Sequence, residues 1–282
     1  MRLPDFIIGG APKAGTTSVF EYLDQHPGVF TSNPKEPHFF ASIDRNEPVR
    51  GMSFSRREYE ALFDGAGLEQ IAGEASTGYL RHARRVAPKL AKCIPDIRLI
   101  FILRDPVDRA YSDFWHRLHT GDIPARKSFA DCAEEPGHWI FHGSYYLDGL
   151  ETFYDHFSHE QILIVLTRDL ADEPDRTLEK TCSHIGVDPG FSFDTARRHN
   201  VTRYPRSPAF LRTFGHLLPG FSQWTSESSL LRPVRSRALF SRHSRKPEMP
   251  TEVRARLVDR FESEILKVSR LIDRDLSDWL SV

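Results

Sequence analysis

The stretch IIGGAPKAGTTSVFEYL, from Ile7 to Leu23, decides how the chain folds. An apolar run leads into a glycine-containing loop, and a helical pattern follows from Thr16. This order of strand, loop and helix is typical of a phosphate-binding loop, where backbone N–H groups and the positive end of the helix dipole face an anion. The stretch therefore predicts an anion site directly after the first strand.

The lysine of this loop stands in an unusual place. A nucleoside triphosphatase loop reads G-x-x-x-x-G-K-[ST], with the lysine directly after the second glycine. Here Gly10 and Gly15 keep the four-residue gap, but Lys13 precedes Gly15 by two residues and a threonine fills the lysine position. A tight strand-to-helix turn with an exposed lysine is the alternative interpretation. The residues that we expect to contact the anion are Lys13, Ala14, Gly15, Thr16, Thr17 and Ser18.

Four short apolar runs predict buried parallel strands, and helical patterns follow or separate them. The runs are residues 5–10, 70–74, 97–103 and 161–167. Strands that alternate with helices form right-handed crossovers, which cover both faces of a parallel sheet. The prediction is an α/β fold of the P-loop type, with three layers and a central, mainly parallel sheet flanked by helices.

We expect one domain over residues 1–282. Residues 203–250 form a basic excursion rich in Ser, Pro and Arg, and residues 203–246 hold nine Lys and Arg against one acid, Glu227. Residues 251–279 predict a C-terminal amphipathic helix, because apolar side chains recur there at helical spacing.

Composition excludes several classes of protein. The formal net charge is −1, from 38 Lys and Arg against 39 Asp and Glu, so no global field attracts nucleic acid. The three cysteines lack the spacing of a disulfide framework or a zinc site, and this favours a reducing compartment. Neither a secretory leader pattern nor an apolar stretch of about 20 residues occurs. These features predict a cytoplasmic protein without a transmembrane segment.

Arg104 directly follows the apolar run 97–103, and Ser112 lies eight residues later on a predicted helix. A Walker-B strand would place an aspartate there to hold Mg²⁺. Arginine instead binds phosphate bidentately and would repel a metal ion. The position favours a second phosphate contact without a metal. A salt bridge of Arg104 with Asp105 or Asp108 at the helix start is the alternative.

The segment NPKEPHFFA, from Asn33 to Ala41, brackets Glu36 with two prolines. Rigid backbone and apolar neighbours would leave the carboxylate partly desolvated, which raises its pKa and makes it a better base. A loop with a surface acid is the alternative interpretation of this segment.

These three motifs, in this order and spacing, resemble the sulfotransferases that use 3′-phosphoadenosine 5′-phosphosulfate (PAPS). The resemblance is to the branch with heparan sulfate sulfotransferases and many bacterial enzymes. It runs from Asp5 to about Phe191 and resumes in the last helix. It implies PAPS as donor, adenosine 3′,5′-bisphosphate (PAP) as product, and no metal.

The resemblance also implies a role for each motif. Lys13 neutralises the leaving phosphate near the bridging oxygen while the loop cradles it. Arg104 and Ser112 hold the 3′-phosphate. Glu36 is the catalytic base that deprotonates the acceptor.

Three further cofactor contacts are implied more weakly. The segment HGSYYLDGLETF nominates Ser144, and SRHSRKPEMP resembles a basic loop that closes over the cofactor, which nominates Arg245 and Lys246. For Arg245 and Lys246, a position on the solvated surface without a ligand is an equally good interpretation. In GEASTGYL the sequence departs from its heparan-type relatives, because Ala75 follows Glu74 where they carry an acid-lysine pair.

The predicted function is transfer of a sulfuryl group to a hydroxyl or amine of a small-molecule or carbohydrate acceptor. His38 and His116 are acceptor-side candidates, since another branch of these enzymes uses a histidine base. A P-loop kinase or ATPase and a non-catalytic module that binds adenosine phosphates are the alternatives. The sequence leaves the acceptor and the oligomeric state open.

Overall fold

The computed structural model describes residues 2–42, 54–196, 204–205, 207, 240–241 and 246–282, which belong to two compact units. Unit 1 comprises Met1–Arg104, Tyr145–Asn200 and Lys267–Arg274. Unit 2 comprises Asp105–Ser144, Val201–Leu266 and Asp275–Val282. Each unit is described in turn. The prediction of a single domain over residues 1–282 stays a prediction.

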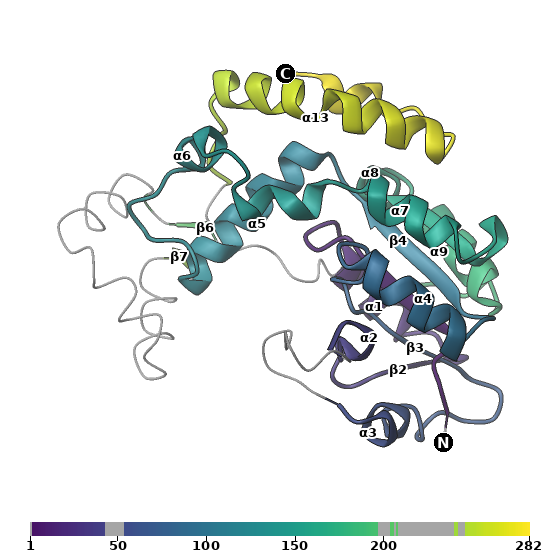
Figure 1. The fold of residues 1–282 in the computed structure, drawn as a ribbon. Coiled ribbons are helices and arrows are strands. Elements are labelled where there is room, and N and C mark those ends of the chain that lie inside the picture. Colours follow the sequence, from purple (N-terminus) through teal and green to yellow (C-terminus); the bar gives the residue numbers. More distant parts are fainter. Residues whose placement is uncertain (1, 43–53, 197–203, 206, 208–239, 242–245) are drawn as a thin grey trace. The chain divides into compact units, whose positions relative to one another are not determined.

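Unit 1 contains the sheet and the helices around it (Figure 1). Its strands are β1 (Phe6–Gly10), β2 (Val29–Thr31), β3 (Ile71–Glu74), β4 (Arg98–Leu103) and β5 (Ile162–Leu166). Its helices are α1 (Thr16–Leu23), α2 (Phe39–Ser42), α3 (Arg56–Ala61), α4 (Ala83–Cys93), α7 (Leu147–Tyr154), η2 (His159–Gln161), α8 (Thr167–Asp172) and α9 (Pro174–Ile185).

The five strands form one sheet in the order β2-β3-β1-β4-β5, and every neighbouring pair is parallel. This confirms the predicted fold class and the four predicted strands. The sequence analysis missed β2, because a three-residue strand gives too short an apolar run to stand out. β1 lies at the centre of the sheet and all five of its residues are buried, so the strand that leads into the glycine loop is part of the core.

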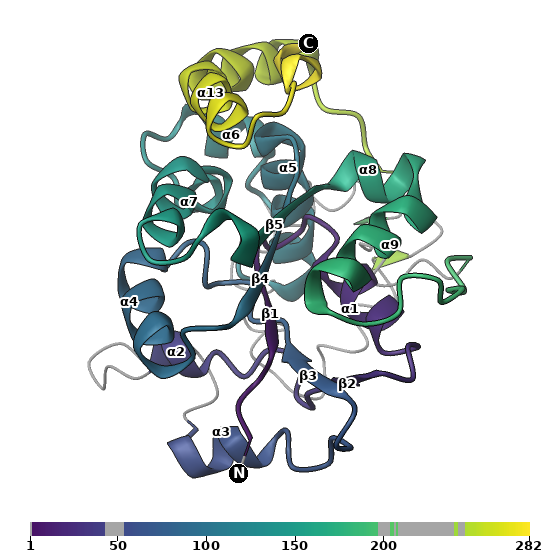
Figure 2. The ribbon, with the colours of Figure 1, turned by 90° about the vertical axis from the view of Figure 1, so that its right-hand side faces the viewer.

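The helices lie on both faces of the sheet. Figure 2 shows α4 and α7 on one face and α1 and α9 on the other. The connection from β1 through α1 runs towards the β2 edge, whereas the connections from β3 to β4 and from β4 to β5 run the opposite way. Because parallel crossovers are right-handed, this reversal places α1 opposite α4 and α7. The crevice at the carboxyl ends of β1 and its neighbours is the expected ligand site.

Unit 2 is built around a long helix and a buried arginine. Its elements are α5 (Pro106–Thr120), α6 (Phe129–Glu134), η1 (Trp139–Ser144), the strand pair β6 (Tyr204–Pro205) and β7 (Phe240–Ser241), the first part of α13 (Thr251–Leu271), and η3 (Ser277–Leu280). Arg109 of α5 is fully buried and donates hydrogen bonds to Ser144 Oγ and to the carbonyl oxygen of Ile140. These contacts hold η1 against α5, since a buried guanidinium must satisfy its N–H groups.

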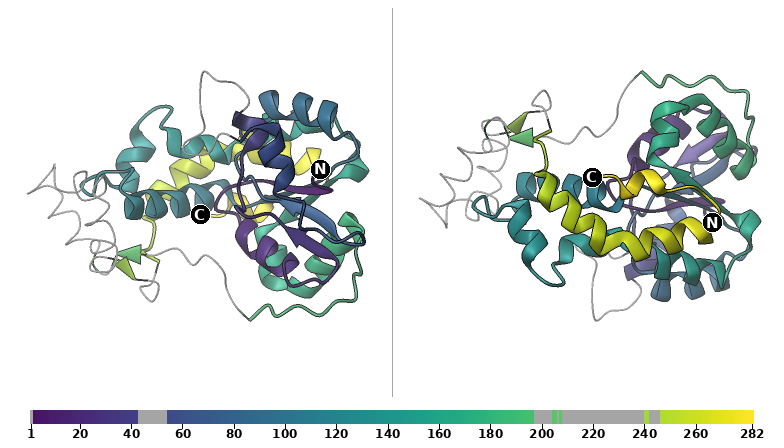
Figure 3. Two further views of the ribbon diagram at one scale, coloured as in Figure 1. Left: turned by 90° about the horizontal axis from the view of Figure 1, so that it is seen from below. Right: turned by 90° about the horizontal axis from the view of Figure 1, so that it is seen from above.

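Helix α13 is continuous but shorter than predicted (Figure 3, right). It begins at Thr251 as expected and ends at Leu271 rather than at residue 279. Asp273 has a φ of 48°, and the Ser269 hydroxyl donates to the carbonyl oxygen of Arg274 at 2.6 Å, which closes a turn after the last helical residue. The predicted apolar stripe is confirmed, because its members are all buried: Val253, Leu257, Phe261, Ile265 and Val268.

The predicted excursion at 203–250 lies mostly outside the described residues. Of its basic side chains, only Lys246 belongs to the described part. Across the described residues, each helix is too short or too polar for a membrane span.

A close approach between α7 and the segment after β3 gives a test of the packing in unit 1. A Cβ added to Gly149 would lie 2.4 Å from the carbonyl oxygen of Leu80 and 3.0 Å from its Cδ1 atom. Gly149→Ala should therefore lower the free energy of unfolding by about 1–3 kcal/mol, the usual cost of overpacking. Urea unfolding followed by circular dichroism measures the loss.

Gly67→Ala is the matched control, because its added Cβ would meet nothing closer than the Gln70 side chain at 3.4 Å. Equal stability of the two variants would contradict the close packing of α7 on this segment.

Candidate active site

The glycine loop between β1 and α1 is held open by three left-handed backbone conformations. Gly10 has a φ of 151°, Lys13 of 69° and Gly15 of 104°. A Cβ on Gly10 would lie 2.9 Å from the Cβ of Leu80 and 3.0 Å from the carbonyl oxygen of Thr77, so only glycine fits there. Lysine has no such freedom at position 13, where the positive φ is strained. The loop geometry therefore depends on both glycines of the predicted motif.

Helix α1 begins at Thr16, directly after the loop. Gly15 is the N-cap residue and supplies no side-chain cap, and the first N–H groups of a helix lack intrahelical partners. With the positive end of the helix dipole, these groups favour a bound anion. The Ala14 N–H is the exception, because it donates to the carbonyl oxygen of Ala11 at 3.3 Å. Thr16, Thr17 and Ser18 remain the better candidates for anion contacts.

Arg104 lies against the loop, as predicted from its place at the end of β4. Its Nη1 atom donates to the carbonyl oxygen of Lys13 at 3.3 Å, and its own carbonyl oxygen accepts from Tyr146 Oη at 2.8 Å. Two residues that are 91 positions apart in the sequence thus meet at the carboxyl edge of the sheet. Their cationic side chains make this edge suited to a polyanionic ligand.

Glu36 is surrounded by hydrogen-bond donors. Lys35 Nζ lies 3.0 Å from Oε1, while Thr77 Oγ1 donates to Oε2 at 3.0 Å. His38 Nε2 lies 3.2 Å from the same Oε2 atom. The carboxylate is half-buried, with 34% of its side chain exposed. Glu36 and His38 are therefore in direct contact through their side chains.

This environment corrects the expectation that the pKa of Glu36 is raised. Burial does raise the pKa, but the hydrogen bond from His38 and the charge and hydrogen bond of Lys35 outweigh it and lower the pKa to about 2. The predicted desolvation is present, and the missing part of the prediction was the neighbouring cations. Glu36 is consequently ionised at neutral pH.

Lys35 joins the loop to this carboxylate. Its Nζ atom also donates to Thr17 Oγ1 of α1 at 3.0 Å, and it lies 5.9 Å from the centroid of the Phe20 ring. One ammonium group thus bridges the anion-binding helix and the predicted base, which makes them one site. The sequence analysis quoted Lys35 without giving it a role. Its position directly before Glu36 is the signal that could have revealed it.

The segment after β3 fixes the backbone around Glu36. The Ala75 N–H donates to the carbonyl oxygen of Lys35 at 2.9 Å. Ser76 Oγ accepts from the His38 N–H at 2.8 Å, and Tyr79 Oη accepts from the Phe40 N–H at 3.2 Å. The sequence analysis considered this segment only for its missing lysine, but its hydroxyl groups hold the site.

The remaining predicted residues lie in unit 2 or outside the described residues. Ser112 is buried on α5, and His116, half-buried, lies one turn further along. Lys246 lies 3.1 Å from Asp108 Oδ1 and 5.1 Å from the centroid of the Tyr111 ring.

Ser144 does not fit its predicted role as a nucleotide contact. It is fully buried, accepts from Arg109 Nε at 2.6 Å and donates to the carbonyl oxygen of Pro106 at 2.7 Å. Its hydroxyl group is therefore committed to the interior of unit 2. Arg245 lies outside the described residues.

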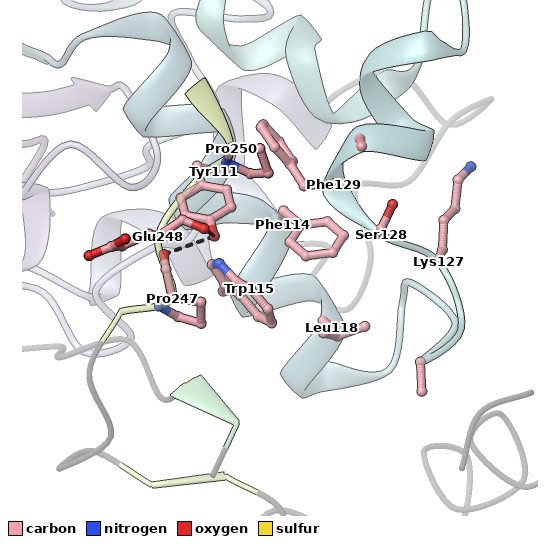
Figure 4. A pocket seen from close by; sticks show the side chains of 12 residues that line it. Tyr111, Phe114, Trp115, Leu118, Lys127, Ser128, Phe129, Pro247, Glu248 and Pro250 are labelled. Carbon is pink, nitrogen blue, oxygen red and sulfur yellow. Dashed lines mark hydrogen bonds between the residues drawn. The ribbon is translucent and has the colours of Figure 1, made fainter. Parts of the chain in front are cut away.

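Unit 2 also contains an apolar cavity of about 220 Å³ (Figure 4). Aromatic side chains of α5 line it together with Phe129, and Tyr111 Oη donates to the carbonyl oxygen of Pro247 at 2.9 Å at its edge. None of the predicted site residues is among its described lining residues. Within the described part of the chain, no group of three or more His, Cys, Asp or Glu side chains could hold a metal ion.

Comparison with known proteins gives consistent matches. The family model described as "Sulfotransferase domain" matches residues 3–213. The mouse bifunctional heparan sulfate N-deacetylase/N-sulfotransferase 4 is 25% identical over 300 residues, which cover 99% of this chain and 31% of that protein. The human heparan sulfate glucosamine 3-O-sulfotransferase 3B1 is 32% identical over 193 residues, which cover 66% of this chain and 47% of that protein. This chain thus spans about a third to a half of the length of these relatives.

Among solved structures, a sulfotransferase from Alicyclobacillus acidocaldarius matches with a TM-score of 0.75 and 25% identity. The match covers 100% of both chains.

The buried carboxylate of Glu74, beneath this site, gives a pH-dependent prediction. Burial raises its pKa from 4.5 to about 7, so the folded chain binds more protons than the unfolded chain between these values. Stability is therefore lost as the pH rises from about 4.5 to about 7, by about 3 kcal/mol for this group. Glu74→Gln should remove this loss, so its stability relative to the unsubstituted chain should improve from pH 5 to pH 8. Parallel pH dependences in urea unfolding would contradict the shift.

Proposed function

The chain belongs to the sulfotransferase domain family, and we propose that it transfers a sulfuryl group from PAPS to a hydroxyl or amine of a small-molecule or carbohydrate acceptor. Family membership confirms the resemblance drawn from the motifs. The observation that carries the proposal is the Lys35 ammonium group, which joins the anion-binding helix to Glu36. Neither the kinase nor the non-catalytic alternative gains support from the comparisons.

The loop fits the phosphosulfate end of the donor. Gly10 leaves room where a side chain would collide, and the start of α1 offers N–H groups and the Thr17 hydroxyl. PAPS supplies the activated sulfuryl group. Lys13 and the loop N–H groups stabilise the negative charge that the 5′-phosphate gains as its bond to sulfur breaks.

The proton of the acceptor passes to the Glu36 and His38 pair. As the acceptor oxygen or nitrogen bonds to sulfur, its proton must leave, and Glu36 is ionised and able to accept it. A carboxylate held by Lys35 is a weak base, and His38 Nε2, which lies 3.2 Å from the other carboxylate oxygen, orients it. We assign Glu36 as the base and His38 as its partner.

Recognition of the 3′-phosphate is assigned to Arg104 and Ser112, with Lys246 and Arg245 as further contacts. The position of Arg104 against the loop supports this assignment, since a guanidinium group binds phosphate bidentately. PAP should accordingly bind better than adenosine 5′-monophosphate.

The class of the acceptor and the location of the protein in the cell are further parts of the proposal. The relatives are named for heparan sulfate, which supports a carbohydrate among the acceptors. Ala75, which follows Glu74 where heparan-type relatives carry a lysine, points to a different sugar or small molecule. We propose a cytoplasmic location, supported by the three free cysteines.

Transfer of labelled sulfate from PAPS to a pooled set of sugars, phenols, lipids and peptides tests the function.

Lys13→Ala should lower kcat by about 10² to 10³, because one preorganised donor to the developing charge is lost. PAP affinity, measured by calorimetry, should fall much less. Lys92→Ala, on the exposed face of α4, is the control and should leave both values unchanged. An absolute requirement for Mg²⁺, or unchanged kcat in Lys13→Ala, would contradict the proposal.

Glu36→Gln tests the base. The amide is nearly isosteric but cannot take a proton, so turnover with an alcohol acceptor should fall by about 10² to 10⁴. An acidic phenol loses its proton readily and should recover much of the activity, while PAP affinity stays near its original value. His38→Gln is the comparison. A loss below tenfold in Glu36→Gln, with a larger loss in His38→Gln, would transfer the role of base to His38.

A further inference from the structure

Glu74 carries a fully buried carboxyl group that takes part in no step of the proposed reaction. It is the last residue of β3, and its exposed fraction is 0%. Oε2 accepts from the Ser76 N–H at 2.6 Å, and Oε1 accepts from Tyr59 Oη of α3 at 3.3 Å. Such a group is costly to bury unless every oxygen finds donors, so its surroundings must be ordered around it.

Ser76, which binds Glu74, also holds the backbone beside Glu36, together with Tyr79. Ser76 Oγ accepts from the His38 N–H, and Tyr79 Oη accepts from the Phe40 N–H. His38 has a φ of 52°, a left-handed conformation that needs such support in a residue other than glycine. One short path of hydrogen bonds therefore runs from Glu74 through Ser76 to the backbone N–H of His38.

A cluster of aromatic rings packs around Phe39 and Phe40, which follow His38 in the chain. The ring of Tyr59 stacks on Phe39 with a centroid distance of 4.3 Å and meets Phe40 edge-on at 5.6 Å. Phe40 in turn lies 6.2 Å from the Tyr79 ring. Because Tyr59 donates to Glu74 and stacks on Phe39, the orientation of these rings depends on the carboxyl group as well.

The protonation state of Glu74 decides how many donors it can accept. The titratable groups that the described residues place around it are Tyr59, Tyr79 and His38. The ionised form accepts from the Ser76 N–H and from Tyr59 Oη. The neutral form carries a proton on one oxygen and must give up or reverse one of these bonds.

We propose that Glu74 is a positioning residue for the proton-transfer pair, which it orients in its ionised form through Ser76 to His38 and through Tyr59 to Phe39 and Phe40. This proposal rests on the proposed function, since it assigns Glu74 to the geometry of that reaction. Burial raises the pKa of Glu74 to about 7, so the orienting form gains population as the pH rises through neutrality. A misplacement of about 1 Å at a reacting group can cost about 10²-fold in rate.

The test compares Glu74→Gln with a matched variant, Glu60→Gln. Glu60 is a buried acid of α3 paired with Arg56, and its substitution removes the same charge from the same unit. In Glu74→Gln we expect kcat to fall about 10- to 100-fold while the KM for PAPS stays within twofold. The rise of kcat near pH 7 in the unsubstituted enzyme should be absent from Glu74→Gln and present in Glu60→Gln. The neutral amide resembles the protonated acid, so the variant should fold.

Ser76→Ala gives a second measurement, because it removes the acceptor of the His38 N–H and leaves the carboxyl group in place. It should lower kcat at least tenfold with the PAPS KM unchanged. The proposal is overturned if folded Glu74→Gln keeps both the original kcat and the rise near pH 7. It is also overturned if Glu74→Gln does not fold and Ser76→Ala keeps the original kcat. Absence of sulfate transfer by the unsubstituted enzyme would instead refute the proposed function.

Discussion

The parallel pairing of β1 with β3 on one side and β4 on the other is the constraint on which the site depends. Because parallel strands end at the same edge, the glycine loop after β1, the segment after β3 and Arg104 after β4 must meet there. The connections leave β1 and its neighbours in opposite directions across the sheet, and ligands of open α/β sheets bind at such a point. The residues of unit 1 that we propose to contact the donor or the acceptor all lie on segments that leave the sheet at this edge, or on segments hydrogen-bonded to them.

Electrostatic balance within the site then decides which groups are ready to react. Lys35 lowers the pKa of Glu36, so the carboxylate is present at neutral pH but is a weaker base than a buried acid alone. Glu74 lies at the end of β3, the strand next to β1. Its pKa is shifted in the opposite direction, because burial dominates there. The pKa values of these two carboxyl groups of one unit thus differ because His38 and Lys35 outweigh burial at Glu36, whereas burial dominates at Glu74.

Sequence patterns predicted the parts of the fold that carry long periodic or apolar signals. The four longer strands, the loop and the start of α13 follow from such signals, and the three motif residues Lys13, Glu36 and Arg104 lie at one edge as expected. The pKa of Glu36 and the burial of Ser144 could not be predicted, because they depend on side chains distant in sequence or on hydrogen bonds within unit 2. The end of α13 was missed because a single left-handed residue, Asp273, overrides the helical pattern.

With the proposed role of Lys13, its left-handed conformation sets stability against catalysis at one position. A residue with a Cβ loses about 1–2 kcal/mol in this region relative to glycine, so the loop holds its lysine at a cost to the fold. Selection for thermal tolerance alone would favour glycine at position 13, whereas selection for turnover would keep lysine. In a library screened only for expression or heat resistance, position 13 would therefore drift towards inactive variants, and a screen for activity must accompany it.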